Sequence, residues 1–107
     1  MNHDYRIGAT DADLKFNVNE DGTLYFVVVP SNASAPNSSQ IKAGTDGQGN
    51  LAVDSGYIAA SFSSPNNVHL SGLTPGHTNY TLYVTAEDAA HNASSPIGLP
   101  FYTGTAD

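Results

Sequence analysis

The sequence predicts an all-β domain, folded as a sandwich of two antiparallel sheets with about seven strands. Short stretches of alternating apolar and polar residues recur along the chain, with turn signals roughly every ten residues. The clearest stretch is 80–86, where Tyr80, Leu82 and Val84 alternate with Thr81 and other partly polar positions. A period of two indicates a strand with one buried face. The 107 residues match the size of one sandwich, so we predict a single domain over 1–107.

The N-terminal part of the chain predicts two strands. We expect a short edge strand at 5–8. A half-buried strand follows, because Leu14, Phe16 and Val18 alternate with polar residues such as Lys15.

Asp21-Gly22 stands between two alternating stretches, a pattern typical of a tight β-hairpin. We therefore expect the strand at 23–29 to pair with the preceding strand through this turn. Pro30 ends the strand, because proline has no N–H to donate to a ladder.

The segment 31–50 changes character. Pro36 and Gly44 bracket a stretch that predicts one short helical turn, since proline is favoured early and glycine late. The Gly-rich stretch 46–50 predicts a loop. The remaining strands are expected at 51–54, 57–62, 67–70, 80–86 and 99–103. Pro96 and Pro100 indicate that the last strand lies at a sheet edge.

A corner is predicted before the strand at 80–86. Leu70 and Leu73 can lie beneath it, while Pro75-Gly76 reverses the chain. We expect Tyr80 to be buried with its hydroxyl bonded to the backbone at 73–76, as in a tyrosine corner.

This Leu-x-Pro-Gly…Tyr pattern resembles fibronectin type III and bacterial immunoglobulin-like domains of repetitive surface proteins. The spacing from Leu73 to Tyr80 is one residue longer than is usual there. The stretch 86–92, AEDAAHN, resembles the Ala-x-Asp-x-x-Gly-Asn ending of this strand in bacterial members, with His91 in place of Gly. The resemblance covers 9–103. It implies an immunoglobulin-like sandwich of the fibronectin type III type, in a piece of a larger multidomain extracellular protein.

The composition argues against several partners. Three Lys and Arg face ten Asp and Glu, giving a formal charge of −7. Nucleic acids and anionic membranes need cationic contacts, so we expect neither as a partner. There is no Cys for a disulfide or thiolate metal site, and no apolar run long enough to enter a membrane. Only 12% of residues are charged, which is typical of exported bacterial proteins, so we expect an extracellular or cell-surface location.

Catalytic motifs are not found in the sequence, which has no nucleophile elbow, P-loop or dinucleotide fingerprint. The four histidines lack metal-ligand spacing, and we expect them to be exposed to solvent: His3, His69, His77 and His91. His77 and His91 lie in predicted loops at opposite ends of one strand, so they cannot share a metal. We therefore expect no enzymatic activity and no cofactor other than a possible calcium ion.

Two acidic pairs are the candidate calcium ligands. Asp11 and Asp13 lie near the start of the chain, and Glu87 and Asp88 end the strand at 80–86. Calcium prefers several oxygen ligands, and the two pairs would form a site if both lay at one pole. The alternative is that these acids cap turns and keep the surface soluble.

Three tyrosines are the candidate sugar-binding residues. The alternation directs Tyr25, Tyr83 and Tyr102 outward on neighbouring strands, where they could form an aromatic platform for sugar rings. Alternatively, these side chains only stabilise the sheet by cross-strand contacts of about 0.2–1 kcal/mol each.

Two sequence patterns bear on covalent modification. Asn-x-Ser/Thr sequons occur at four positions that chance explains in a chain so rich in Asn, Ser and Thr: Asn32, Asn37, Asn79 and Asn92. An isopeptide crosslink through Lys15 is disfavoured, because the alternation directs this side chain outward.

The function expected from this sequence is a non-catalytic spacer or adhesion-stalk module of a bacterial surface protein. Its partners would be neighbouring domains of the same chain. The alternatives are a carbohydrate-binding module and an accessory domain of a secreted polysaccharide hydrolase. Copies of the module in the parent protein would favour the stalk, and a glycosidase domain would favour the accessory role.

Overall fold

The computed structural model describes residues 2–17, 21–61, 66–88, 90 and 92–104. In this part of the chain the structure contains seven strands and one helix. Their bounds are β1 Asn2–Ile7, β2 Ala12–Asn17, β3 Gly22–Pro30, α1 Ser38–Ala43, β4 Asp54–Ala60, β5 Asn66–Leu70, β6 Asn79–Glu87 and β7 Ile97–Tyr102.

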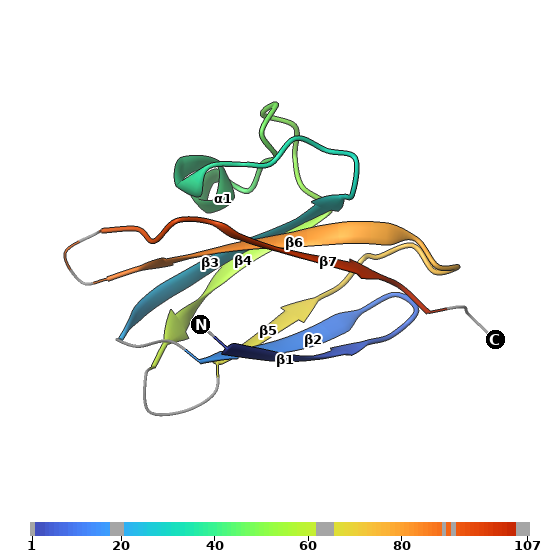
Figure 1. Ribbon diagram of the computed structural model, residues 1–107, viewed down its shortest axis with the longest axis horizontal. Coiled ribbons are helices and arrows are strands. Elements are labelled where there is room, and N and C mark those ends of the chain that lie inside the picture. Colours follow the sequence, from blue (N-terminus) through green and yellow to red (C-terminus); the bar gives the residue numbers. More distant parts are fainter. Residues whose placement is uncertain (1, 18–20, 62–65, 89, 91, 105–107) are drawn as a thin grey trace.

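The strands form two antiparallel sheets that pack face to face, as Figure 1 shows. The three-stranded sheet has the order β1-β2-β5, and the four-stranded sheet has the order β4-β3-β6-β7. Helix α1 lies on the outer side of the four-stranded sheet. The predicted all-β sandwich with two antiparallel sheets is confirmed. No helix in the described residues is long and apolar enough to cross a membrane.

The core lies between the sheets and follows the alternation read from the sequence. In β6, Tyr80, Leu82 and Val84 are buried, and Leu14 and Phe16 face them from β2. Each fully buried side chain of this size contributes about 1.5–3 kcal/mol relative to exposure. The alternation arises because only one face of each of these strands meets the opposite sheet.

Strand β3 departs from this pattern because both of its faces are covered. Val27 and Val29 point away from the main core but are fully buried in a second cluster with Ile41 of α1. The helix therefore protects the outer face of β3 from water. This covering is why the sequence of β3 is almost continuously apolar.

Helix α1 is held at both ends by its own sequence. The side chain of Asn37 accepts a hydrogen bond from the Gln40 N–H, and the Gln40 side chain accepts one from the Asn37 N–H, each at 2.9 Å. This is a capping box. At the other end Gly44 adopts a left-handed conformation with φ of 82°. The predicted short helical turn is confirmed.

The predicted hairpin through Asp21-Gly22 is wrong. Strand β2 pairs with β1 and β5, whereas β3 pairs with β4 and β6, so this segment crosses from one sheet to the other. Gly22 is the first residue of β3. A Cβ atom at this position would lie 2.1 Å from the carbonyl oxygen of Glu87. The glycine is therefore needed for close approach of β3 to the end of β6.

The remaining strand predictions, apart from the one at 51–54, correspond to strands of the structure with shifted bounds. The predicted strand at 51–54 is wrong, because Leu51 forms only an isolated bridge with Thr45 and β4 begins at Asp54. Strand β7 begins two residues earlier than predicted, at Ile97. Val18 and residue 62, which the predictions placed at strand ends, lie outside the described residues.

Candidate functional site

The predicted tyrosine corner is present at one end of the sandwich. Tyr80 is 4% exposed, and its hydroxyl accepts a hydrogen bond from the Thr74 N–H at 2.9 Å. Its ring stacks on Phe101 of β7, with 5.8 Å between the ring centroids. This end of the sandwich, which contains the turn 8–11, the corner 71–78 and Gly104, is called the C-terminal pole (right in Figure 1).

Thr103 fixes the chain where β7 ends. Its side chain is completely buried. The hydroxyl donates to the Thr74 carbonyl at 2.7 Å and accepts from the Thr78 N–H at 3.1 Å, while the Thr103 N–H donates to the Thr78 carbonyl at 3.0 Å. These bonds fasten the end of β7 to the corner. The sequence did not predict this role, because a single threonine at the end of a strand gives no signal that it will bond to a distant turn.

Gly104 extends this fastening to the other sheet. Its N–H donates to the carbonyl of Gly8, directly after β1, at 3.0 Å. Its carbonyl accepts from the Gly76 N–H at 3.0 Å. The point where the chain leaves β7 is thus bonded to both sheets. We call this set the exit clamp: Gly8, Thr74, Gly76, Thr78, Thr103 and Gly104.

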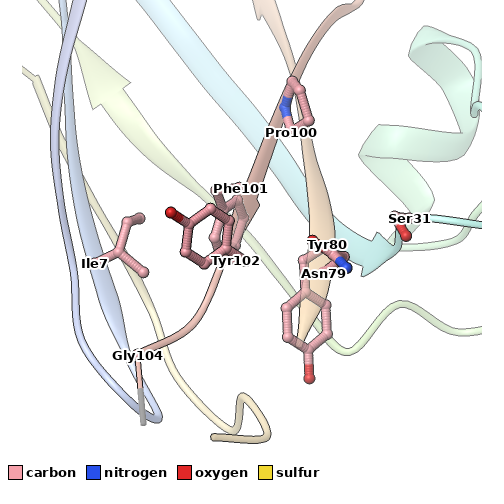
Figure 2. A pocket seen from close by; sticks show the side chains of 8 residues that line it. All are labelled: Ile7, Ser31, Asn79, Tyr80, Pro100, Phe101, Tyr102 and Gly104. Carbon is pink, nitrogen blue, oxygen red and sulfur yellow. The ribbon is translucent and has the colours of Figure 1, made fainter. Parts of the chain in front are cut away.

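A cavity of about 470 Å³ lies beside the exit clamp, at the end of β7 (Figure 2). Its lining includes Ile7, Asn79 and Tyr102. Tyr102 is 55% exposed, and its ring stacks on the imidazole of His77 with 3.9 Å between centroids. His77 is the one described non-glycine residue with positive φ, at 62°.

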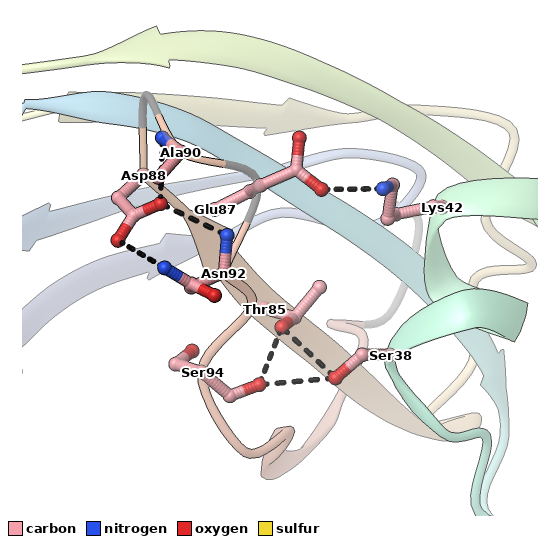
Figure 3. Close-up of polar contacts among 8 residues, drawn as sticks. All are labelled: Ser38, Lys42, Thr85, Glu87, Asp88, Ala90, Asn92 and Ser94. Atoms are coloured by element: carbon pink, nitrogen blue, oxygen red, sulfur yellow. Dashed lines mark hydrogen bonds and ion pairs between the residues drawn. The ribbon is translucent and has the colours of Figure 1, made fainter.

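The opposite pole is held by side chains. Figure 3 shows Lys42 of α1 paired with Glu87 at the end of β6, where Glu87 is only 7% exposed. The hydrogen bond to Glu87 raises the pKa of Lys42. The carboxylate of Asp88 accepts from the N–H groups of Ala90 and Asn92, each at 2.9 Å.

The predicted calcium site across the two acidic pairs is not formed. Asp11 and Asp13 lie at the C-terminal pole, whereas Glu87 and Asp88 lie at the opposite pole. Strand β6 alone spans about 26 Å between the poles, at about 3.3 Å per residue. The prediction placed the start of β2 and the end of β6 at one pole. An odd number of strands crosses the molecule between these two points, so they lie at opposite poles. No group of three or more His, Asp or Glu suited to a metal occurs among the described residues.

The acidic residues have other contacts. Asp13 Oδ1 lies 2.7 Å from Nδ1 of His69 on the neighbouring strand β5. This hydrogen bond is the main reason why the pKa of His69 is raised. The negative charges of Asp13, Asp11 and Asp54 raise the pKa further, and desolvation lowers it by less. His91 lies outside the described residues.

The three candidate tyrosines share one outer face but do not form one platform. Tyr25 and Tyr83 are half-buried against the cluster that contains Ile41, and Lys42 lies 5.5 Å above the Tyr25 ring. Tyr102 lies four residues along β7 from Gly98, which pairs with Tyr83. The separation is therefore about 13 Å along the strand. Only Tyr102 is widely exposed, because the short helix packs over the other two.

The remaining candidates are placed as follows. The Asn37 side chain caps α1, and the Asn92 side chain donates to Asp88 at 3.4 Å. Asn32 and Asn79 are exposed. Lys15 is exposed, as the alternation predicted.

Comparison with known proteins gives a fold but no family. No family model matches the chain, and no curated protein matches it. Among solved structures, a computationally redesigned β-sandwich protein superposes with a TM-score of 0.61 at 17% identity, covering 100% of this chain and 95% of its own. The soluble domain of PmoD from Methylocystis sp. (Rockwell) has a TM-score of 0.53 at 11% identity, covering 91% of this chain and 75% of its own. The chain is a β-sandwich protein.

Proposed function

We propose that the chain is a non-catalytic spacer module of the fibronectin type III kind, in a bacterial extracellular or cell-surface protein. The seven strands in two antiparallel sheets and the bond from the Thr74 N–H to the Tyr80 hydroxyl support this family. The neighbouring domains of the same chain are its partners. A surface with few charged residues and a net charge of −7 favours solubility outside the cell.

The observation that carries the proposal is the position of the two chain ends. Asn2, the first residue of β1, pairs with Asn17 at the far end of β2. Gly104 bonds to Gly8, at the other end of β1. The chain therefore enters near one pole and leaves at the other, along the 44 Å long axis (Figure 1). Copies joined end to end would extend a stalk, and the exit clamp would direct each following module outward.

Small-angle X-ray scattering of two copies joined end to end tests this role. We expect a maximum dimension close to twice the 44 Å axis. The matched control joins the same copies through a long Gly-Ser linker, which behaves as a flexible coil and broadens the distance distribution. A directly joined pair that packs side by side, with a maximum dimension near that of one copy, contradicts the spacer role.

A further inference from the structure

We propose that the cavity at the end of β7 binds a neutral saccharide, with Tyr102 as its aromatic surface. This site retains only Tyr102 of the predicted platform, because Tyr25 and Tyr83 are packed against the cluster around α1. It is also independent of the spacer role, which depends on the chain ends. The volume of about 470 Å³ lies within the range of natural ligand pockets, about 300–1,000 Å³.

The lining combines an apolar floor with polar groups. Ile7, Tyr80 and Phe101 contribute apolar surface, and the exposed residues Ser31 and Asn79 add a hydroxyl and an amide (Figure 2). None of the eight described lining residues is charged, although the chain carries a net charge of −7. Sugars present the matching chemistry, since their CH groups pack on aromatic rings and their hydroxyls bond to amides and hydroxyls.

The Tyr102 ring is held in place from outside the cavity. His77 stacks on it with an angle of 23° between the ring planes. The left-handed backbone of His77, with φ of 62°, is sterically unfavourable for a residue with a Cβ atom. It persists because the flanking residues Gly76 and Thr78 belong to the exit clamp. His77 is therefore a positioning residue for Tyr102.

Other ligand classes fit this site less well. A peptide could add to the free edge of β7 only through a continuous row of backbone donors. Pro100 has no N–H, and the N–H of Gly104 is already bonded to Gly8. An anionic ligand such as a phosphate or a uronic acid needs cationic side chains, and the described residues of the lining include none.

The first experiment is a glycan array that carries both neutral and anionic polysaccharide fragments. We expect the protein to bind a subset of the neutral glycans and none of the anionic ones. Nuclear magnetic resonance titration with the retained neutral oligosaccharide should then shift the amide signals of Ser31, Asn79 and Tyr102. Absence of binding to every neutral glycan, or shifts confined to the opposite pole, overturns the proposal.

Two variants distinguish binding at this site from non-specific binding. Tyr102→Ala should weaken binding about tenfold, the value of one lost ring contact. Tyr57→Ala is the matched control, because Tyr57 is a 71% exposed tyrosine on β4, away from the cavity. Equal losses in the two variants overturn the proposal. Tyr102→Leu preserves apolar bulk and checks that any loss is not caused by unfolding.

A further variant tests the positioning role. His77→Gly removes the stacked ring but relieves the left-handed backbone. We expect affinity to fall several-fold while the melting temperature is unchanged or rises. Unchanged affinity in His77→Gly contradicts the positioning role, and a fall in both quantities assigns His77 to stability alone.

Discussion

The two poles of the sandwich are closed by different kinds of interaction. At the C-terminal pole the exit clamp consists of backbone groups and one buried hydroxyl, that of Thr103. At the opposite pole an ion pair, Lys42 with Glu87, and the turn at Asp88 hold α1 and the end of β6. Neutral hydrogen bonds depend little on salt, whereas partly exposed ion pairs are screened. The exit clamp thus consists of interactions that are less sensitive to salt than the ion pair at the opposite pole.

The largest effect is expected at the opposite pole, for Gly22→Ala. The new Cβ atom would lie 2.1 Å from the Glu87 carbonyl oxygen, so β3 and β6 would have to separate. We expect a loss of about 3 kcal/mol in the free energy of unfolding, as in overpacked sites. Gly104→Ala is the control, because its Cβ would meet nothing closer than 3.8 Å. Equal stability of the two variants in urea unfolding would contradict the close-approach role of Gly22.

The next effect concerns the exit clamp. Thr103→Val keeps the shape of the side chain but leaves the Thr74 carbonyl and the Thr78 N–H without this partner. We expect a loss of about 2 kcal/mol, because unsatisfied groups keep their desolvation penalty. The matched variant is Thr85→Val, also fully buried, which should lose only about 1 kcal/mol. The Ser94 carbonyl that Thr85 contacts also accepts from Ser38, at 3.0 Å (Figure 3).

The two variants should also differ in their response to mechanical force. In force spectroscopy of a tandem, we compare the decrease in unfolding force with the loss of unfolding free energy measured in urea. The ratio of these two quantities should be larger for Thr103→Val than for Thr85→Val. The same ratio for both variants would mean that the exit clamp has no special mechanical role.

Tyr80→Phe probes the same pole through the tyrosine corner. The Thr74 N–H would lose its bond to the hydroxyl, while the ring would still pack on Phe101. We expect a loss of about 1 kcal/mol by chemical denaturation. A loss below the error of the measurement would show that water replaces the hydroxyl at no cost.

The sequence predicted the features that depend on local patterns. Alternation identified the strands, because each has one face against the core, and Pro75-Gly76 with Tyr80 identified the corner. The exit clamp could not be predicted, because most of its bonds join backbone groups distant in sequence. The predicted turn at Gly22 is wrong because an Asp-Gly pair fits both a tight turn and a close contact between strands.

The candidate sites depended on geometry that the sequence does not contain. The acidic pairs were separated by the direction in which each strand runs, which the local pattern leaves undetermined. Tyr25 and Tyr83 were predicted on the correct face, but a six-residue helix with one buried residue, Ile41, gave no signal that it would pack against them. Of the three candidate tyrosines, Tyr102 lines the cavity at the end of β7.

A smaller effect is expected for the ion pair at the opposite pole. Lys42→Gln removes the charge that faces the nearly buried Glu87 carboxylate, so the melting temperature should fall. High salt should lower the melting temperature of the native protein toward that of the variant, because salt screens a pair whose lysine is 39% exposed. Thr103→Val should keep its deficit at all salt concentrations. A salt-independent deficit in Lys42→Gln would contradict the contrast between the poles.

The smallest effect is a pH dependence at the C-terminal pole. The bond to Asp13 raises the pKa of His69 in the folded state above its unfolded value. The folded state therefore binds the proton more tightly, and the stabilisation is fully present below about pH 6 and lost as the pH rises through the raised pKa. The melting temperature of the native protein should exceed that of His69→Gln at about pH 5.5, with the difference shrinking as the pH rises through the raised pKa of His69. Both side chains are well exposed, so the difference should be small. A difference that grows with pH would have the wrong sign for this pair, and would mean that neutral His69 is the stabilising form.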